Sequence, residues 1–166
     1  SSDSTLGGIS IRDVPPGYDY PSFIAMDQPR HSSQRKTVSP MFTPTHLDEL
    51  AKLIRERSQR VLDDLPRNET FNFVDRVSIE LTTQMLATLF DFPFEERHLL
   101  PYWSDIMTST ELVGKTGADE GARQQELLKC LTYFSRLWQE RAAQPKKFDF
   151  ISLLAHDPGT KDMIND

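Results

Sequence analysis

Residues 71–91, FNFVDRVSIELTTQMLATLFD, constrain the fold more than any other stretch, because they are the most apolar and repeat their apolar side chains at helical spacing. These side chains mark two faces of one helix, the first formed by Val74, Val77, Leu81 and Leu89 and the second by Ile79, Leu86 and Phe90. A helix that is apolar on two faces usually lies in the centre of a bundle. The segment therefore predicts a helical protein with neighbours on both sides of this helix.

The other apolar segments also have helical spacing, and no segment shows sustained alternation of apolar and polar residues. Thr45 and Asp48 have the spacing of a capping box at the start of a helix. Residues 112–121 are predicted to be a flexible connection between two helices. The chain of 166 residues is long enough for one ordinary core. The sequence thus predicts an all-α protein of five or six helices, with helices from Pro29 onward and over 45–62, 71–91, 94–107, 118–143 and 148–156.

One short motif is the strongest indication of a binding site. Asp27-x-Pro29 predicts a turn, and a helix that begins there places His31 and Arg35 on one face, one turn apart. Arginine presents a planar fork that suits a carboxylate or a phosphate, and histidine adds a second donor. Two interpretations remain open on spacing alone: a clamp for one anionic group, or a solvated helix face whose two charges are neighbours by chance.

Charge and composition exclude several classes of protein. A net charge of −6 argues against general nucleic-acid binding, which needs a basic surface. No apolar run approaches the roughly 20 residues that span a bilayer, and the first residues lack the basic and apolar regions of a signal peptide. The single cysteine, Cys130, excludes an internal disulfide and is predicted to be a buried structural thiol. These features predict a cytoplasmic protein without a transmembrane segment.

Motifs of several other kinds of site are missing or incomplete. The sequence contains no HExxH, CxxC or GxSxG, and its four histidines lack metal-ligand spacing. Gly114-Lys115-Thr116 resembles the end of a phosphate-binding loop, but Ser109 stands where that loop needs a glycine. Glu120 and Arg123 have the spacing of an ordinary surface pair near a helix start. The motif at His31 and Arg35 is therefore the candidate site.

That motif, Asp27-x-Pro29-x-His31-x-x-x-Arg35 followed by Phe42-Thr43-Pro44, resembles the helix-C motif of bacterial cytochrome P-450 monooxygenases. More narrowly, the stretches 23–44, 73–97 and 148–156 resemble the soluble bacterial family that hydroxylates medium-chain alkanes at the terminal carbon. The resemblance covers essentially the whole chain, in order, but well under half of that family's length.

The resemblance implies an incomplete single domain over 1–166, the N-terminal and central helical part of the cytochrome P-450 fold. Residues 1–25 would form the loop between helices B and C, and residues 26–166 would run from helix C, through helix G, to the start of helix H. The implied cofactor is haem b, whose thiolate ligand lies outside the fragment, because Cys130 lacks the family's Phe- and Gly-rich surroundings. The fragment alone is expected to be inactive and not stably folded.

The resemblance also implies roles for particular residues. His31 and Arg35 would hold a haem propionate, and the replacement of the family's first proline by Gln28 changes only a turn residue. Ile24 would pack on the haem edge. Five apolar residues are candidates for contact with an alkyl substrate, three in the loop between helices B and C and two after helix F: Leu6, Ile9, Ile11, Leu112 and Val113.

The implied activity is the insertion of one oxygen atom from O₂ into a medium-chain alkane. Electrons would come from NAD(P)H through a ferredoxin reductase and a ferredoxin, for which Arg30 and Lys36 are candidate docking residues. Two alternatives remain at this stage. One is a cytochrome P-450 that acts on fatty acids or terpenes, and the other is a non-enzymatic helical module whose basic stretch 30–36 binds an acidic protein.

Overall fold

The computed structural model describes residue 23, residues 26–108 and residues 117–163. Its regular elements in these ranges are all helical, which confirms the predicted all-α class. In chain order they are α1 (Arg30–Val38), the 3-10 helix η2 (Ser39–Phe42), α2 (Pro44–Asp63), the π-helical η3 (Val74–Ile79), α3 (Glu80–Phe90), the 3-10 helix η4 (Phe94–Glu96), α4 (Leu99–Thr108), α5 (Gly117–Ala142) and α6 (Phe150–His156). None of these described helices has both the length and the apolar character needed to cross a bilayer.

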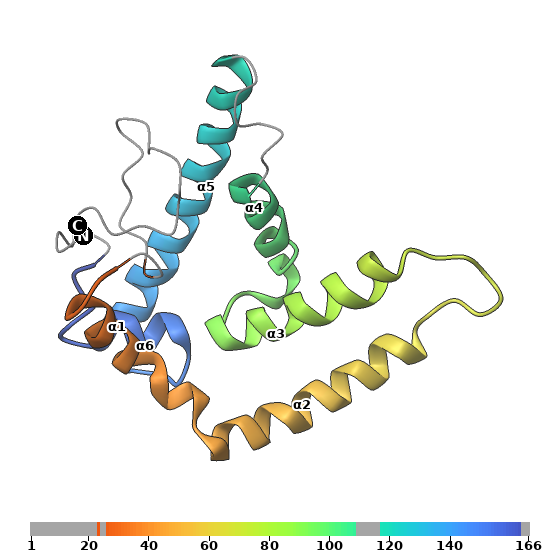
Figure 1. Ribbon diagram of the computed structural model, residues 1–166, viewed down its shortest axis with the longest axis horizontal. Helices are drawn as coiled ribbons and strands as arrows, with labels where there is room; N and C mark the ends of the chain where they lie inside the picture. Colours follow the sequence, from red (N-terminus) through yellow and green to blue (C-terminus); the bar gives the residue numbers. More distant parts are fainter. Residues whose placement is uncertain (1–22, 24–25, 109–116, 164–166) are drawn as a thin grey trace.

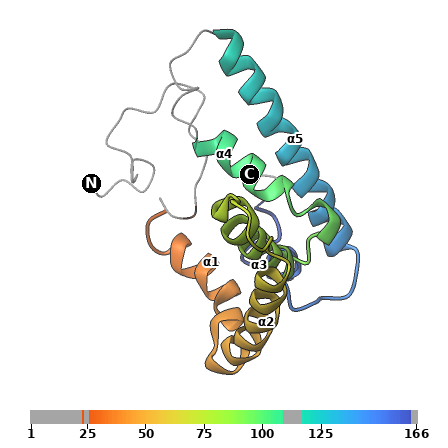
Figure 2. The same cartoon turned by 90° about the vertical axis from the view of Figure 1, so that its right-hand side faces the viewer.

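The helices form two arms that meet near the ends of the described chain (Figures 1 and 2). In the lower arm of Figure 1, α2 and α3 pack against each other, and α4 leads from the end of α3 up to α5. Helix α5 then runs back down to α6, which packs against both α5 and α1. The first and last α-helices therefore lie side by side, although most of the sequence separates them.

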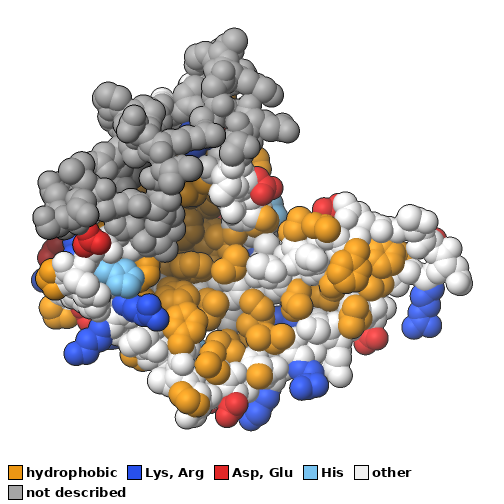
Figure 3. Space-filling model, viewed as in Figure 1, with side chains coloured by type: hydrophobic (Ala, Val, Ile, Leu, Met, Phe, Trp, Pro, Cys, Tyr) orange, Lys and Arg blue, Asp and Glu red, His pale blue; other side chains and the backbone are white. Residues whose placement is uncertain are grey.

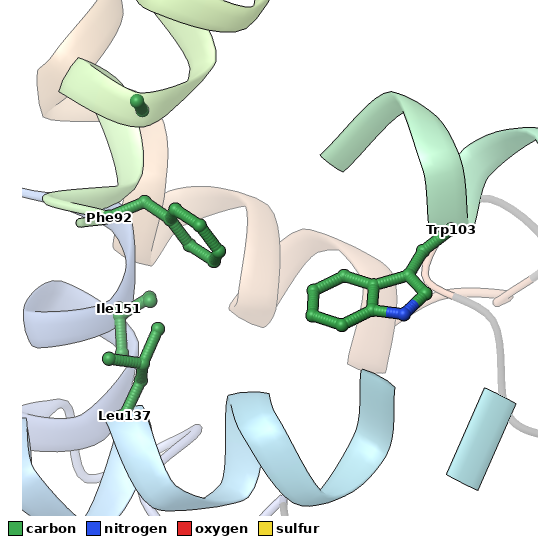
Figure 4. Close-up of a cluster of buried hydrophobic side chains, with 5 residues drawn as sticks. Phe92, Trp103, Leu137 and Ile151 are labelled. Atoms are coloured by element: carbon green, nitrogen blue, oxygen red, sulfur yellow. The ribbon is translucent and has the colours of Figure 1, made fainter. Parts of the chain in front are cut away.

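The core lies where α3, α4, α5 and α6 meet, and Figure 4 shows its buried side chains. Aromatic rings make up much of it: Phe92 stacks on Tyr133 with ring centroids 5.1 Å apart, and Trp103 lies 5.4 Å from the same ring. Large aromatic side chains bury the most apolar area per residue, so they dominate the energetics of such a core. The buried residues of this cluster are Ala87, Phe92, Trp103, Leu137 and Ile151.

Residues 71–91 are predicted to form a helix in the centre of the bundle, and the second half of this segment, α3, does so. Helix α3 contacts α2, α4 and α6, so it has neighbours on more than one side. The first half differs from the prediction, since Val74–Ile79 takes π-helical turns and the side chains of Val74 and Ile79 stay exposed. Thr83 and Ala87, rather than the large apolar residues, are the buried positions of α3, because small side chains allow the neighbouring helices to approach closely.

An ion-pair cluster ties together the ends of α3 and α5. Asp91 ends α3 in a left-handed conformation (φ 47°), which a short polar side chain tolerates better than most residues do. Its carboxylate forms an ion pair with Arg141 Nη2 at 2.9 Å and accepts a hydrogen bond from Lys147 Nζ at 3.2 Å. Arg141 also donates to the backbone carbonyl of Asp91 at 2.8 Å. The segment that leads into α6 is thereby fixed to the core.

Two local predictions need correction, and a third is not tested. The capping box at Thr45 and Asp48 is wrong, because α2 begins at Pro44, whose fixed φ and missing N–H suit the first helical position. The predicted connection 112–121 is too long, since α5 begins at Gly117, while 109–116 lie outside the described residues. The predicted surface pair of Arg123 with Glu120 stays a prediction, because the side chain of Glu120 is not among those that the structure describes. Arg123 donates to the carbonyls of Ile106 and Met107 at the end of α4, at 3.1 and 3.3 Å. Those carbonyls have no partner within their own helix.

One face of the molecule is unusually apolar. Figure 3 shows hydrophobic side chains gathered over α2 and α3, on the side that faces the reader. Monomeric proteins seldom expose contiguous apolar patches of this kind without a partner or ligand. The described residues therefore form part of a larger packed structure, with Leu47, Ile54, Leu62, Phe73, Val74 and Ile79 among their exposed large hydrophobic residues.

Candidate functional site

The predicted turn and helix at the candidate site are both present. The His31 N–H donates to the carbonyl of Asp27 and the Ser33 N–H donates to that of Pro29, each at 3.1 Å, so the turn runs directly into α1. His31 and Arg35 both lie within α1, four residues apart. Side chains at this spacing are neighbours on one face of a helix.

The surroundings of these two side chains differ. His31 is half-buried, and its imidazole stacks on the ring of Phe23, with centroids 4.8 Å apart and planes inclined by 28°. Arg35 is exposed, and its guanidinium makes no hydrogen bond or ion pair among the described residues. Neither ring nitrogen of His31 has a hydrogen-bond partner within that part of the chain. The face thus offers donors of two kinds that the described structure does not itself use.

Packing on α6 fixes the direction of this face. Gln34 is buried, and it lines a cleft with Ser33 and the turn that follows α6. A Cβ atom on Gly159 in that turn would lie 3.1 Å from Ser33 Oγ, which is closer than nine in ten real contacts of that kind. The close approach therefore favours a glycine at 159, and together with the buried Gln34 it fixes one side of α1 against this part of the chain.

The electrostatic character of α1 is basic. Its first turn contains no acidic residue, and Arg35 and Lys36 lie in its last turn, where cations interact favourably with the helix dipole. Arg30 and Lys36, the predicted docking residues, are both exposed. In Figure 3 a histidine and basic side chains adjoin over α1, at the edge of the apolar face. This arrangement can bind an anion beside an apolar surface.

The other predicted site residues cannot be placed in this way. Ile24 and the five candidates for contact with substrate lie outside the described residues and stay predictions: Leu6, Ile9, Ile11, Leu112 and Val113. Cys130 packs against the core cluster half-buried, and burial raises the pKa of its thiol, as expected for a structural cysteine. In the ranges that the structure describes, no three potential metal ligands gather into a site.

Known proteins resemble this chain over most of its length, although no protein-family model matches it. It is 30% identical over 129 residues to cytochrome P-450 55A3 of Fusarium lichenicola, covering 76% of this chain and 30% of that protein. A steroid C26-monooxygenase of Mycobacterium tuberculosis is 33% identical over 120 residues, covering 72% of this chain and 27% of that protein.

Solved structures agree with these relatives and cover more of the chain. CYP153D17 from Sphingomonas sp. PAMC 26605 superposes with a TM-score of 0.78 at 43% identity, covering 94% of this chain and 40% of that one. The chain belongs to the cytochrome P-450 superfamily. Cytochrome P-450-153 from Novosphingobium aromaticivorans gives a TM-score of 0.74 at 41% identity, covering 93% and 37%. The chain thus carries part of the cytochrome P-450 fold and spans between 27% and 40% of the length of these proteins.

Haem is the cofactor that this superfamily implies, and the donors on α1 fit one part of it. A haem propionate is a carboxylate with two acceptor oxygens, and the Arg35 guanidinium can meet it with a planar pair of N–H groups. His31 can add a donor from one turn away. The absence of a competing carboxylate on Arg35 within the described residues is the structural observation that supports this fit.

Sequence reasoning missed Phe23 as a part of this site. Phe23 precedes His31 by eight residues, and no helical spacing relates the two side chains. The signal that was available is the position of Phe23 at the start of the stretch 23–44 that resembles the alkane-hydroxylating family.

Proposed function

We propose that this chain is part of a haem-thiolate monooxygenase that hydroxylates medium-chain alkanes at the terminal carbon. Electrons would come from NAD(P)H in the cytoplasm, through a ferredoxin reductase and a ferredoxin. The observation that carries the proposal is the pair of uncommitted donors, His31 and Arg35, on a helix that matches the cytochrome P-450 fold. The substrate class rests on the sequence resemblance of 23–44, 73–97 and 148–156 to the alkane-hydroxylating family.

The proposed task of His31 and Arg35 is to hold one haem propionate and so to fix the position of the cofactor. Bound haem supplies the iron that activates O₂. Arg35 would donate two parallel N–H groups to the propionate, and His31 would donate a third from its ring edge. Charge-assisted hydrogen bonds of this type contribute about 1.5–3 kcal/mol each. The exposed position of Arg35 places its contribution at the lower end of that range.

An alkane offers no hydrogen-bonding group, so its binding site must work through shape and buried area. We propose that Leu6, Ile9 and Ile11, together with Leu112 and Val113, supply this apolar contact. Each methylene group buried is worth about 0.8 kcal/mol, which is roughly a fourfold change in affinity. Affinity should therefore rise with chain length until the pocket is full.

The electron donor would dock on the basic side of α1. Arg30 and Lys36 are exposed cations of the same helix that would hold the propionate, so an acidic ferredoxin on this side would lie close to the haem. Electrostatic complementarity of this kind acts mainly on the rate of association and weakens with salt.

The test of the clamp uses the full-length protein and three variants, H31A, R35A and the double variant. Haem content per polypeptide and the carbon-monoxide difference spectrum should fall in each single variant and fall further in the double variant. R55A, at an exposed arginine on α2, is the matched control and should retain its haem. Unchanged haem content and an unchanged spectrum in the double variant would contradict the proposal.

The test of the substrate class uses the same protein with compounds of graded length. The n-alkanes should be bound and hydroxylated at the terminal carbon, with an affinity that rises by about fourfold per methylene group over the shorter members of the series. Fatty acids and terpenes of equal carbon number are the comparison. Equal or better turnover of either class would assign the protein to a different branch of the superfamily.

A further inference from the structure

The contact between Phe23 and His31 depends on a reversal of the chain before α1. The Met26 N–H donates to the carbonyl of Phe23 at 3.3 Å, and the Asp27 carbonyl accepts from the His31 N–H at 3.1 Å. These two turns bring Phe23 back over the first turn of the helix. Its ring then lies 4.8 Å from the imidazole, nearly parallel to it. This is a favourable offset-stacked range for aromatic rings.

The stack restricts the terminal side-chain torsion of His31, which sets the orientation of the imidazole plane. The terminal torsion of a histidine has broad minima, so a free side chain samples many orientations of its ring plane. A phenyl ring on one face fixes that plane. Both ring nitrogens lie in the plane, at the edge, and the stack leaves this edge uncovered. The contact therefore orients His31 without occupying either ring nitrogen.

Another histidine of the protein shows the contrast. In His156 the Nδ1 atom faces the Ser152 carbonyl at 2.8 Å and the Nε2 atom faces the Gln144 carbonyl at 3.0 Å, so both nitrogens are committed to the fold. In His31 neither nitrogen has a partner among the described residues, although the ring is half-buried and stacked. A ring that is held firmly while its nitrogens stay uncommitted is arranged for a ligand.

We propose that Phe23 is a positioning residue that holds the His31 imidazole in the plane in which it donates to the haem propionate. This inference rests on the proposed function of His31 and Arg35. Arg35, which no described side chain restrains, is then ordered by the propionate, whereas His31 is ordered beforehand. Ordering one side chain at an interface costs affinity, and loss of the stack should therefore speed haem release by between about twofold and about tenfold.

The experiment is a double-mutant cycle on the rate of haem release from the full-length haem protein to an excess of a haem-binding scavenger. F23L removes the ring but keeps an apolar side chain, and F23Y keeps the ring. Because Phe23 is 39% exposed, neither substitution should unfold the protein. F23L should speed release, F23Y should restore the original rate, and F23L should have no added effect in the H31A background. The propionate bending band in the resonance Raman spectrum should shift alike in F23L and H31A.

Two results would overturn the inference, and they differ from each other. Equal effects of F23L in the original and the H31A backgrounds would show that Phe23 does not act through His31, while the clamp itself would stand. An H31A variant that releases haem at the original rate would overturn the part of His31 in the clamp, and with it the role of Phe23.

Discussion

The isolated 166-residue chain should not unfold cooperatively, because it buries too little of its own surface. Its accessible surface is 12053 Å² for a mass of 19.1 kDa. A fully unfolded chain of this mass exposes about 27,700 Å², so folding removes only about 56% of the surface from water. Domains of about 150 residues bury about 68–70%, and even marginal domains of 60 residues bury about 60%. The chain therefore lies below the range in which single domains are stable.

The assay compares the isolated chain with the full-length protein at low concentration. The isolated chain should show helical far-ultraviolet circular dichroism, weak near-ultraviolet signals, strong binding of an apolar dye and a broad thermal transition. A sharp transition, with equal calorimetric and van't Hoff enthalpies and without dye binding, would refute the reasoning. That result would also favour a free-standing helical module over part of a haem enzyme.

A substitution on the apolar face sharpens the same prediction. Leu62 is 54% exposed on α2, so L62Q should lower dye binding by the isolated chain and leave its helical content unchanged. In the full-length protein the remainder of the domain should cover this face, and L62Q should then cost about 1.5–3 kcal/mol of stability. K52Q, at an exposed polar position of the same helix, is the control, and it should change neither protein by more than about 0.5 kcal/mol. If L62Q changed the stability of the full-length protein as little as K52Q does, the prediction that the remainder of the domain covers this face would be contradicted.

Three further predictions concern the full-length protein. R141M should cost about 2–3 kcal/mol in a denaturant titration, because it removes a hydrogen bond and an ion pair to Asp91 from a side chain that is only 12% exposed, and a loss below about 0.5 kcal/mol would contradict the assigned role. Burial and a nearby carboxylate raise the pKa of Tyr133 to about 12. The stabilisation that the neutral Tyr133 side chain contributes should therefore be lost as the pH rises from about 10 to about 12. A Y133F variant that loses the same stability over this range would show that another group causes the loss. G159A should cost about 1–3 kcal/mol and speed haem loss, since its Cβ would press on Ser33, and S33A should recover part of that cost.

Helix positions were predictable wherever strong local signals mark their ends. The predicted helix 118–143 corresponds to Gly117–Ala142, because Pro145 follows it and its apolar side chains keep helical spacing throughout. The predicted helix 148–156 corresponds to Phe150–His156, which starts where the Asp149 side chain accepts from the Ser152 N–H at 2.8 Å. Both of these signals are local, so sequence alone carries them.

The candidate site was only half predictable for the same reason. The spacing of His31 and Arg35 follows from one helical turn, and the resemblance of the surrounding motif assigns the anion that they would bind. The stack of Phe23 on His31 and the contact of Gly159 with Ser33 depend on how distant segments approach each other. The spacing of apolar residues along the sequence carries no information about such contacts. The π-helical turns of Val74–Ile79 likewise have no simple sequence signal, since the same residues satisfy an ordinary helical pattern.

The packing of α1 on α6 sets the order of events during synthesis. Arg30 and Phe150, the first residues of these helices, are separated by 120 positions in the chain. At about 5–20 residues per second, a ribosome needs roughly 6–24 seconds to add that length. During this interval α1 has no α6 to pack against, and His31 and Arg35 face no fixed direction. If His31 and Arg35 hold haem as proposed, their capture of the cofactor would be a late step in the maturation of the full-length protein.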